Sequence, residues 1–379
     1  MKRVLLFSET QSWCGAAAQQ LALAKGLAAA QWEVRVASPE HGELAKRAAA
    51  AGFIHLPINP QQDHDLSVAC RLAQSIQEGG IDVLHAHQPR AHAVSLAALA
   101  ILSGAGPAFI VTRRLPLGTA KQGHNSLKFR NPRVNGFIAV SEAIRRELLE
   151  AGVAPEKVVT IPNGVDIATF QPVAKDEELL RELAIPDGVP VIGKITHFND
   201  WKGQPIVIEA AARMAAEGRR AVFLFAGRGT DSEEMKSRVR KAGLPEESVR
   251  LLGFRNDVPR VLSVCDVSVS AATRGDCIAG AVRESLAMRI PVVVSDTPGN
   301  VELIQEGRTG RTFAAGSATD LTRVLGETLD DTVAARFKAL EGCKLVRERY
   351  SNERLVEATL DFYQKTLARK SAPAKDPQR

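Results

Sequence analysis

Short apolar runs alternate with longer segments of helical periodicity over the first 151 residues of the chain. The first run, Val4–Phe7, is followed by a polar turn and then by an Ala- and Leu-rich segment of helix-forming composition, 16–30. Strands that alternate with helices in this way are typical of βαβ units, in which helices cover both faces of a parallel sheet. The strands expected here are 4–7, 34–37, 53–56, 82–85, 108–112 and 136–140, and the helices are 16–30, 43–51, 66–78, 90–102 and 142–151.

The alternation starts again after Pro162–Asp166, so the pattern predicts a second doubly wound unit. A segment from Asp166 to about Val189 bridges the two halves, and a final helix is expected over roughly 352–368. The fold class is therefore α/β, with two Rossmann-like doubly wound parallel-sheet domains facing a central cleft at the carboxyl ends of their strands, where such proteins bind ligands. The strands expected in the second half are 190–195, 221–226, 249–252, 266–270 and 291–294, and the helices are 203–217, 231–242, 257–263 and 280–288.

Length and composition agree with two domains and indicate the cellular compartment in which the protein is expected. A chain of 379 residues exceeds what one hydrophobic core usually holds. Its five cysteines are odd in number and scattered, which favours a reducing compartment and argues against a disulfide framework or a zinc site. The apolar run after Met1 is too short for a signal peptide, and no stretch approaches the roughly 20 apolar residues of a membrane span. We expect a cytoplasmic protein, with peripheral contact at the inner face of the cytoplasmic membrane left open.

The net charge of +6 is unevenly distributed along the chain. The segment 113–146 carries eight basic residues and one acid, Glu142, and it includes a long polar stretch, 113–133, of the kind that is usually functional or mobile. This excess of positive charge would attract anionic lipid head groups or a phosphorylated substrate, although it could equally be a solvated surface. Nucleic acid is not an expected partner, because few aromatic residues lie among the basic ones and the whole chain has only 18. The basic residues are Arg113, Arg114, Lys121, Lys128, Arg130, Arg133, Arg145 and Arg146.

The most informative stretch of the sequence places two carboxylates, Asp276 and Glu284, on either side of a run of small and apolar residues. That run opens the helix expected at 280–288, and an apolar strand follows it. The unpaired amides at the start of such a helix, together with its dipole, favour a phosphate. The carboxylates cannot bind that phosphate, but they can accept hydrogen bonds from hydroxyls of a sugar and a ribose. A nucleotide-sugar site explains this pattern; the alternative is that Asp276 is an ordinary acid at a helix N-terminus and Glu284 a solvated or ion-paired one.

Further candidates follow the ends of other strands in the second half. His197 and Lys202-Gly203 come after strand 190–195, where the lysine is well placed to neutralise a diphosphate or is simply a solvated residue of the first helical turn. Gly227 and Arg228 follow strand 221–226, and Gly253 and Phe254 follow strand 249–252. These glycines would let a backbone or a nucleobase approach closely.

In the first half, Gly15 and Ala16 follow the first strand, at a position where a backbone must approach a ligand closely. The sequence around them is no Gly-x-Gly-x-x-Gly fingerprint, which argues against a dinucleotide cofactor, and the patterns of P-loop, α/β-hydrolase and zinc-protease sites are absent from the chain. Arg113 and Arg114 follow strand 108–112 and could reach a phosphate or an acidic acceptor; loop-surface arginines are the alternative. His85 and His87 are interpreted as ordinary core or loop histidines.

Taken in order, these segments resemble the family 4 retaining glycosyltransferases of the GT-B fold. The resemblance covers about residues 1–368, and it depends on the number and order of the motifs more than on any single one. The matching segments are the Gly15 loop, Asp82–His87, Val140–Ala143, Ile161–Asp166, Lys202-Gly203, Gly227–Gly229, Leu252–Phe254 and the pair Asp276 and Glu284 with Pro291–Val293.

The resemblance implies that the two domains bind different substrates. It implies an N-terminal acceptor-binding domain, 1–166, a C-terminal nucleotide-sugar-binding domain, 167–348, and a terminal helix, 349–370, that crosses back to the first domain. The composition of the remaining tail, 371–379, with two prolines and no apolar periodicity, predicts disorder.

The resemblance also implies roles for individual residues. Glu284 would hold the ribose hydroxyls and Asp276 those of the donor sugar, while the amides of Ile278, Ala279 and Gly280 would face the diphosphate. His197 and Lys202 would neutralise the leaving diphosphate, and Arg113 falls where many relatives carry a histidine near the reacting centre. Three positions depart from the family pattern: Asp276 stands in place of a glutamate, His197 in place of an arginine, and Ile278-Ala279 in place of Phe-Gly.

The function expected from these features is that of a retaining glycosyltransferase. It would move a sugar from a nucleotide diphosphate donor, a UDP-sugar first of all, to a cell-envelope glycan or a lipid-linked acceptor of the lipopolysaccharide type. No cofactor and no metal are expected, because basic residues occupy the places where a metal would otherwise neutralise the diphosphate. The alternatives are a nucleotide-sugar epimerase or phosphorylase-like enzyme of the same fold, and a catalytically weak binding protein.

Overall fold

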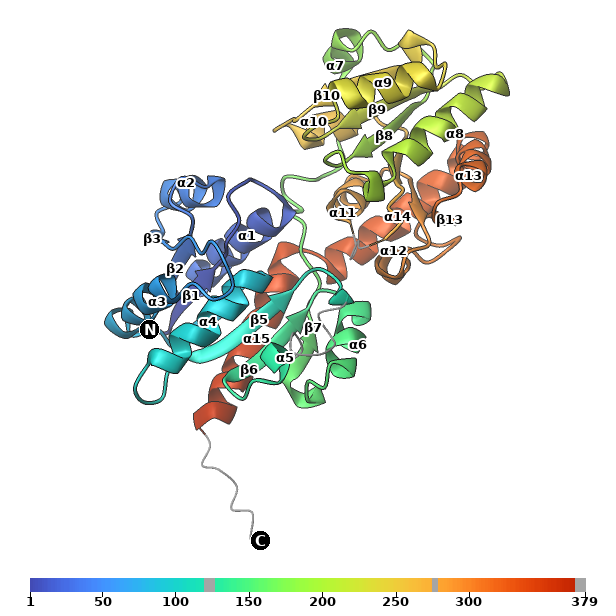
Figure 1. Ribbon diagram of the computed structural model, residues 1–379. Helices are drawn as coiled ribbons and strands as arrows, with labels where there is room; N and C mark the ends of the chain where they lie inside the picture. Colours follow the sequence, from blue (N-terminus) through green and yellow to red (C-terminus); the bar gives the residue numbers. More distant parts are fainter. Residues whose placement is uncertain (119–126, 275–278, 372–379) are drawn as a thin grey trace. The chain divides into compact units, whose positions relative to one another are not determined.

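The computed structural model describes residues 1–118, 127–274 and 279–371, and it divides into two compact units (Figure 1). The N-terminal unit comprises Met1–Gly164 together with the C-terminal segment that begins at Asn352. The C-terminal unit comprises Val165–Ser351. The chain therefore leaves the first unit after Gly164 and returns to it at Asn352, a few residues from the limits of 166 and 349 that the sequence suggests.

The N-terminal unit is built on a seven-stranded sheet whose strand pairs are all parallel, in the order β3-β2-β1-β4-β5-β6-β7. The order reverses between β1 and β4, so the loops that follow these two strands diverge to opposite sides and leave a crevice. The strands are β1 (Arg3–Phe7), β2 (Glu33–Ser38), β3 (Ile54–Pro57), β4 (Val83–Ala86), β5 (Ala108–Arg113), β6 (Val134–Ala139) and β7 (Val158–Thr160). The helices are α1 (Gly15–Ala29), α2 (Glu43–Ala50), α3 (Leu66–Gly79), α4 (Pro89–Ile101), α5 (Leu127–Arg130), α6 (Glu142–Glu150) and the short η3 (Pro155–Lys157).

The central strands of this sheet are buried on both faces, which explains their continuous apolar sequences. All four residues from Val4 to Phe7 are fully buried, as are Phe109, Ile110 and Val111 on β5. Helices start where the sequence supplies caps: the Asp65 carboxylate accepts the Val68 amide proton at the start of α3 at 3.2 Å.

The terminal helix, α15 (Asn352–Ser371), packs against α1, β5 and β6 of the N-terminal unit (Figure 1). Two glycines permit this close approach. A Cβ atom on Gly26 would lie 2.2 Å from Val356 Cγ2, and one on Gly136 would lie 2.6 Å from the Phe362 ring. The fully buried Tyr363 faces Trp32 at a ring-centroid distance of 5.5 Å. The helix is therefore part of the N-terminal core.

The C-terminal unit has a six-stranded parallel sheet in the order β10-β9-β8-β11-β12-β13, which repeats the topology of the first sheet. Its order reverses between β8 and β11, which makes these two strand ends the equivalent crevice. The strands are β8 (Val191–Ile195), β9 (Val222–Ala226), β10 (Val249–Gly253), β11 (Val267–Ser270), β12 (Val292–Ser295) and β13 (Arg311–Phe313). The helices are α7 (Glu177–Glu182), η4 (Asp200–Lys202), α8 (Gln204–Ala216), α9 (Glu233–Lys241), η5 (Glu246–Ser248), α10 (Val258–Ser263), α11 (Gly280–Ala287), α12 (Pro298–Leu303), α13 (Ala318–Asp330) and α14 (Thr332–Arg349).

Sequence periodicity misses several of these elements. The short strand β7 and the helix α7 lie in segments interpreted as connections, and β13 with α12, α13 and α14 lies in a region where no further sheet is expected. The short elements β7, β13 and α12 carry too few residues for periodicity to be visible. Helix α14 buries one stripe, but it also carries the exposed apolar residues Val333 and Phe337 outside that stripe, which obscures its period.

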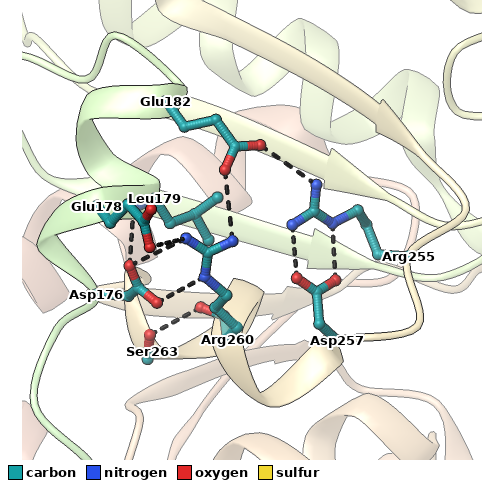
Figure 2. A network of polar contacts seen from close by, with 8 residues as sticks. All are labelled: Asp176, Glu178, Leu179, Glu182, Arg255, Asp257, Arg260 and Ser263. Carbon is teal, nitrogen blue, oxygen red and sulfur yellow. Dashed lines mark hydrogen bonds and ion pairs between the residues drawn. The ribbon is translucent and has the colours of Figure 1, made fainter.

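A cluster of ion pairs fixes the chain where it enters the C-terminal unit (Figure 2). The Arg260 guanidinium on α10 contacts the carboxylates of Asp176 at 2.7 Å, Glu178 at 3.1 Å and Glu182 at 3.4 Å. Arg255 joins the cluster through Glu182 at 3.5 Å and through two parallel bonds to Asp257. The cluster links α7 to α10 within this unit.

Candidate functional site

The loop between β8 and α8 places a lysine and a histidine side chain at the carboxyl edge of the C-terminal sheet. Lys202 Nζ lies 4.1 Å from the centroid of the Trp201 ring, a distance typical of a cation–π contact. The exposed His197 ring meets the same indole edge-on, with centroids 6.4 Å apart. The structure thus brings the two predicted diphosphate ligands to a single tryptophan, whose contribution the sequence does not reveal.

This loop is fixed against the end of β11, the strand on the other side of the topological switch. The fully buried Gln204 donates a hydrogen bond from Nε2 to the His197 carbonyl at 2.9 Å, and the Thr273 amide donates to the Trp201 carbonyl at 2.9 Å. Gly203 adopts φ 79°, and a Cβ atom there would lie 1.8 Å from the Ala271 carbonyl oxygen. Only glycine fits this position, so Lys202 is held next to the switch point.

Glu284 lies in the second turn of α11, and its carboxylate reaches back over the first turn. A Cβ atom on Gly280 would be 3.5 Å from Glu284 Oε1. The N-cap residue of the helix is Ala279, whose methyl group cannot accept a capping hydrogen bond. Burial raises the pKa of Glu284 above its ordinary value, and the neighbouring Arg283 lowers it only in part. Glu284 is half-buried, and in the ranges that the structure describes no group donates a hydrogen bond to its carboxylate, so the oxygens are available to accept from a ligand.

Two of the other predicted ligands, Asp276 and Ile278, lie outside the described residues. Gly227 and Gly253 are described and are engaged with the unit's own backbone. A Cβ atom on Gly227 would lie 2.2 Å from the Thr196 carbonyl oxygen, and the Gly227 amide donates to the Gly253 carbonyl at 2.7 Å. These two glycines therefore permit the packing of neighbouring strand ends. Their exposed neighbours, Arg228 and Phe254, form a pair with 5.8 Å between guanidinium carbon and ring centroid.

The equivalent edge of the N-terminal sheet carries two buried histidines. His85 contacts the Tyr363 hydroxyl through Nδ1 at 2.5 Å and the Thr112 hydroxyl through Nε2 at 2.6 Å. The His87 ring lies over His85 with centroids 4.0 Å apart. Burial holds the pKa of both histidines well below the ordinary value, so both are neutral at physiological pH.

The two neighbouring arginines at the end of β5 have different environments. Arg113 is only 6% exposed and its guanidinium lies 5.6 Å from the Phe129 ring, on the side of α5. The Arg114 guanidinium, half-buried, donates to His87 Nδ1 from both terminal nitrogens at 3.1 Å and to the His87 carbonyl at 3.2 Å. Arg114 and His87 thus form a pair that the sequence did not single out, although the spacing of two residues between His85 and His87 places both on one face of the sheet.

Gly15 and Ala16 begin α1, as expected from their position after β1. Cys14 occupies the N-cap position and its thiol makes no capping hydrogen bond to the helix, and Gly15 is exposed with nothing within 4 Å of a Cβ atom built on it. The first turn of a 15-residue helix is therefore accessible at the edge of the N-terminal sheet.

Two family profiles match consecutive parts of the chain. The Glycosyltransferase Family 4 profile matches residues 13–169, and the Glycosyl transferases group 1 profile matches residues 175–340. The chain belongs to the family 4 glycosyltransferases. The β8–α8 loop with Lys202 and the helix α11 with Glu284 both lie within the second match. His85 and His87 lie within the first.

Curated relatives of this glycosyltransferase include several sugar-transferring enzymes. A phosphatidyl-myo-inositol mannosyltransferase of Mycobacterium leprae is 27% identical over 346 residues, with 88% of each chain covered. The N-acetyl-alpha-D-glucosaminyl L-malate synthase of Bacillus anthracis is 22% identical over 309 residues, with 80% of each chain covered.

Solved structures establish the GT-B fold. The Anabaena protein HepE, crystallised in complex with UDP and glucose, has a TM-score of 0.83 at 19% identity and covers 96% of this chain and 100% of its own. A glycosyltransferase of Rickettsia africae has a TM-score of 0.84 at 19% identity, covering 97% of this chain and 98% of its own.

The glycosyltransferase contains one Asp-x-Asp sequence, Asp63-His64-Asp65, a spacing that could ligate a divalent cation. Both carboxylates have other partners: Asp65 caps α3, and Asp63 lies 3.9 Å from Lys128 Nζ. Across the described residues, no three His, Cys, Asp or Glu side chains converge in a way that would hold a metal ion.

The basic segment 113–146 does not form a continuous row of solvated charges. Besides the two arginines already described, Lys128 lies near Asp63, Arg130 donates to the Ala151 carbonyl at 2.7 Å, and Arg145 lies 3.8 Å from Glu142. Arg133 and Arg146 are exposed, and Lys121 lies outside the described residues. None of the helices in the described ranges is long and apolar enough to cross a membrane.

Proposed function

We propose that this glycosyltransferase transfers a sugar, with retention of anomeric configuration and without a metal ion, from a UDP-sugar to a cell-envelope glycan or lipid-linked acceptor. The donor is suggested by HepE, which was crystallised with UDP and glucose. The acceptor class is suggested by the mycobacterial relative, whose name states a phosphatidyl-myo-inositol substrate.

The observation that carries this proposal is the state of Glu284. A half-buried carboxylate to which none of the described residues donates a hydrogen bond, beside a helix start whose N-cap residue is an alanine, is well suited to accept from the hydroxyls of a ligand. A ribose offers two adjacent hydroxyls, and the diphosphate attached to it would meet the amides of Ala279 and Gly280. One nucleotide therefore satisfies both features of α11.

The cations at the end of β8 supply the chemistry that such a donor needs. Loss of the diphosphate leaves negative charge on its oxygens, and preorganised cations lower the barrier by stabilising that charge. Lys202 is positioned by Gly203, whereas His197 contributes only when it is protonated. We assign hydroxyls of the donor sugar to Asp276, and the leaving phosphate itself helps to deprotonate the acceptor on the same face of the sugar.

We place the acceptor on the N-terminal unit and the enzyme at the inner face of the cytoplasmic membrane. The exposed Arg133 and Arg146 would contribute weak attraction to anionic lipid head groups. Sedimentation with vesicles that contain anionic lipid should then fall on replacing both arginines by glutamine, and binding that is unchanged would remove the membrane from the proposal.

Two measurements test the donor half of the proposal. Calorimetry should show UDP binding that exceeds GDP and ADP binding, and that weakens in Glu284→Gln. Release of UDP from UDP-sugars in the absence of acceptor separates an enzyme from a binding protein.

A third measurement tests the stereochemistry and the metal independence of the transfer. Recovery of a transferred product with the donor's anomeric configuration, detected by NMR in the presence of EDTA, excludes an epimerase. Activity that EDTA abolishes and Mg²⁺ or Mn²⁺ restores would contradict metal independence.

A further inference from the structure

Arg114 and His87 form a polar pair in the N-terminal unit to which the proposed function assigns no role. Arg114 follows the last residue of β5, and His87 follows the last residue of β4, so the pair sits beside the reversal of strand order between β1 and β4. Ligands bind at such crevices in doubly wound sheets. The pair therefore occupies a place where a side chain can meet a substrate.

The hydrogen bonds fix the charge of each partner. A guanidinium has donors only, so His87 Nδ1 must accept from it and the ring must carry its proton on Nε2. Burial and the nearby Arg114 charge hold the pKa of His87 well below the ordinary value, which agrees with a neutral ring. Arg114, whose pKa burial lowers to about 10, remains protonated at neutral pH. The pair carries one positive charge and no negative one.

This positive charge has no counter-ion in the part of the chain that the structure describes. Its hydrogen-bond acceptors are a neutral ring nitrogen and a carbonyl, and the Arg114 Nε atom has no acceptor there. Moving a cation partly out of water costs free energy, and in this pair no contact with an anion offsets that cost. By contrast, the half-buried Arg260 faces the carboxylates of Asp176, Glu178 and Glu182.

The scaffold behind the pair is rigid. His87 lies on His85, whose two ring nitrogens are held by the hydroxyls of Thr112 on β5 and Tyr363 on α15. His87 is 2% exposed, and its amide donates to the Phe7 carbonyl at 2.9 Å. A guanidinium fixed in this way has lost its side-chain freedom before a ligand arrives, which favours binding.

We propose that Arg114, oriented by His87, binds a phosphate or carboxylate group of the acceptor at the carboxyl edge of the N-terminal sheet. Arg114 would touch the anion, and His87 is a positioning residue. One terminal nitrogen of the guanidinium donates to both the ring and the carbonyl of His87, so the hydrogens left for a ligand are the second one on the other terminal nitrogen and the one on Nε. These two neighbouring donors match the paired oxygens of either anion. This inference rests on the proposed function in one respect, the assignment of the anion to an acceptor.

The experiment uses the full chain labelled with ¹⁵N-histidine and follows the ring nitrogens of His87 by NMR, with assignment by His87→Asn. The ring should show the Nε2–H tautomer, with Nδ1 shifted as a hydrogen-bond acceptor and no titration between pH 6 and pH 8. Inorganic phosphate, added against sodium chloride of equal ionic strength, should shift the Nδ1 signal saturably.

Variants identify the groups responsible. Arg114→Met should weaken phosphate binding at least tenfold and Arg114→Lys by less, while Arg71→Met, which removes an exposed charge from the same unit, should leave it unchanged. His87→Ala should weaken binding with the charge retained, and His87→Asn, which keeps an acceptor oxygen, should recover part of it. If Arg114→Met does not fold, the Arg114→Lys and His87 variants still decide the question.

The source of the anion is decided by UDP and by Lys202→Ala. A phosphate effect on His87 that persists in Lys202→Ala supports an acceptor anion. An effect produced only by UDP, and lost in Lys202→Ala, assigns the guanidinium to the donor diphosphate and overturns the acceptor site. No effect from either probe overturns the anion site itself, while normal UDP binding by calorimetry would leave the proposed donor function intact.

Discussion

The two sheets share one strand order, yet their carboxyl edges present charge in different ways. At the C-terminal edge, His197 and Lys202 extend from a short loop and contact an indole, with His197 exposed to solvent. At the N-terminal edge, Arg114 is half-buried and held by a neutral histidine that lies on a second one. The repeated topology therefore places loops at equivalent positions. The burial of each side chain, however, determines its charge state and how much it destabilises the folded protein. Substitutions at the C-terminal edge should change activity with little loss of stability, whereas substitutions at the N-terminal edge should change stability as well.

Lys202→Ala provides the largest test of this contrast. Removing one preorganised group that stabilises the leaving charge should lower kcat by roughly 10²–10³-fold. The free energy of unfolding should change little, because surface charges contribute little to the fold. Donor turnover and thermal unfolding of the same samples check both halves. Lys241→Ala, which removes an exposed lysine from α9, is the matched control. Near-normal turnover of Lys202→Ala would favour a weak binding protein over an enzyme.

Glu284→Gln should weaken UDP binding by about 1–3 kcal/mol, the range for hydrogen bonds to charged groups. The same change should raise the melting temperature of the ligand-free protein. The folded-state pKa of Glu284 lies above its unfolded value, so ionisation opposes folding above that pKa, and a neutral amide removes this opposition. Calorimetry and a melting series from pH 4 to pH 8 measure the two effects. Unchanged UDP affinity would place the ribose elsewhere.

Tyr363→Phe tests whether the N-terminal edge is coupled to stability. The variant keeps the ring but removes the hydroxyl that contacts buried His85 Nδ1, leaving a buried nitrogen without a partner. The expected loss is about 1–3 kcal/mol in the free energy of unfolding, measured by urea denaturation. UDP affinity should be unaffected. If stability does not change, the buried histidines do not depend on α15 for their hydrogen bonding.

His197→Arg should change the pH dependence of the rate more than its maximum. A histidine loses its charge as the pH rises past about 6.5, whereas arginine stays protonated. The wild-type rate should therefore fall through this range, and the variant should show a flatter profile with equal or higher activity at pH 8. The pH–rate series requires one donor throughout. Parallel profiles for the two proteins would mean that His197 does not share the role of Lys202.

The smallest effect is expected for Arg260→Gln in the ion-pair cluster of Figure 2. The hydrogen bond from Arg260 holds the pKa of Asp176 below its ordinary value, so its stabilising effect is present above the unfolded pKa of about 3.9 and is lost as pH falls through the folded pKa. The melting temperature of the variant should thus be lower than that of wild type at pH 7, by less in high salt, and the difference should shrink below pH 4. Arg213→Gln, which breaks a single helical pair with Glu209, is the control and should have a weaker effect.

The sequence by itself determined the alternation of strands and helices, the two-unit organisation and the family. Buried parallel strands such as Val4–Phe7 must be apolar throughout, and glycines such as Gly203 must be kept where a Cβ atom would collide with backbone, so both leave a local signal. Short elements such as β13 leave none, because three residues cannot show a period.

Only the tertiary structure decided which polar residues act together. Arg113 and Arg114 are adjacent and chemically identical in the sequence, but one faces Phe129 and the other faces His87. His85 and His87 resemble ordinary core histidines until α15, 278 residues further along the chain, brings the Tyr363 hydroxyl to His85. Burial, and with it the protonation state of a side chain, depends on all the segments that surround it, and those contacts are too distant in sequence to be read from local patterns.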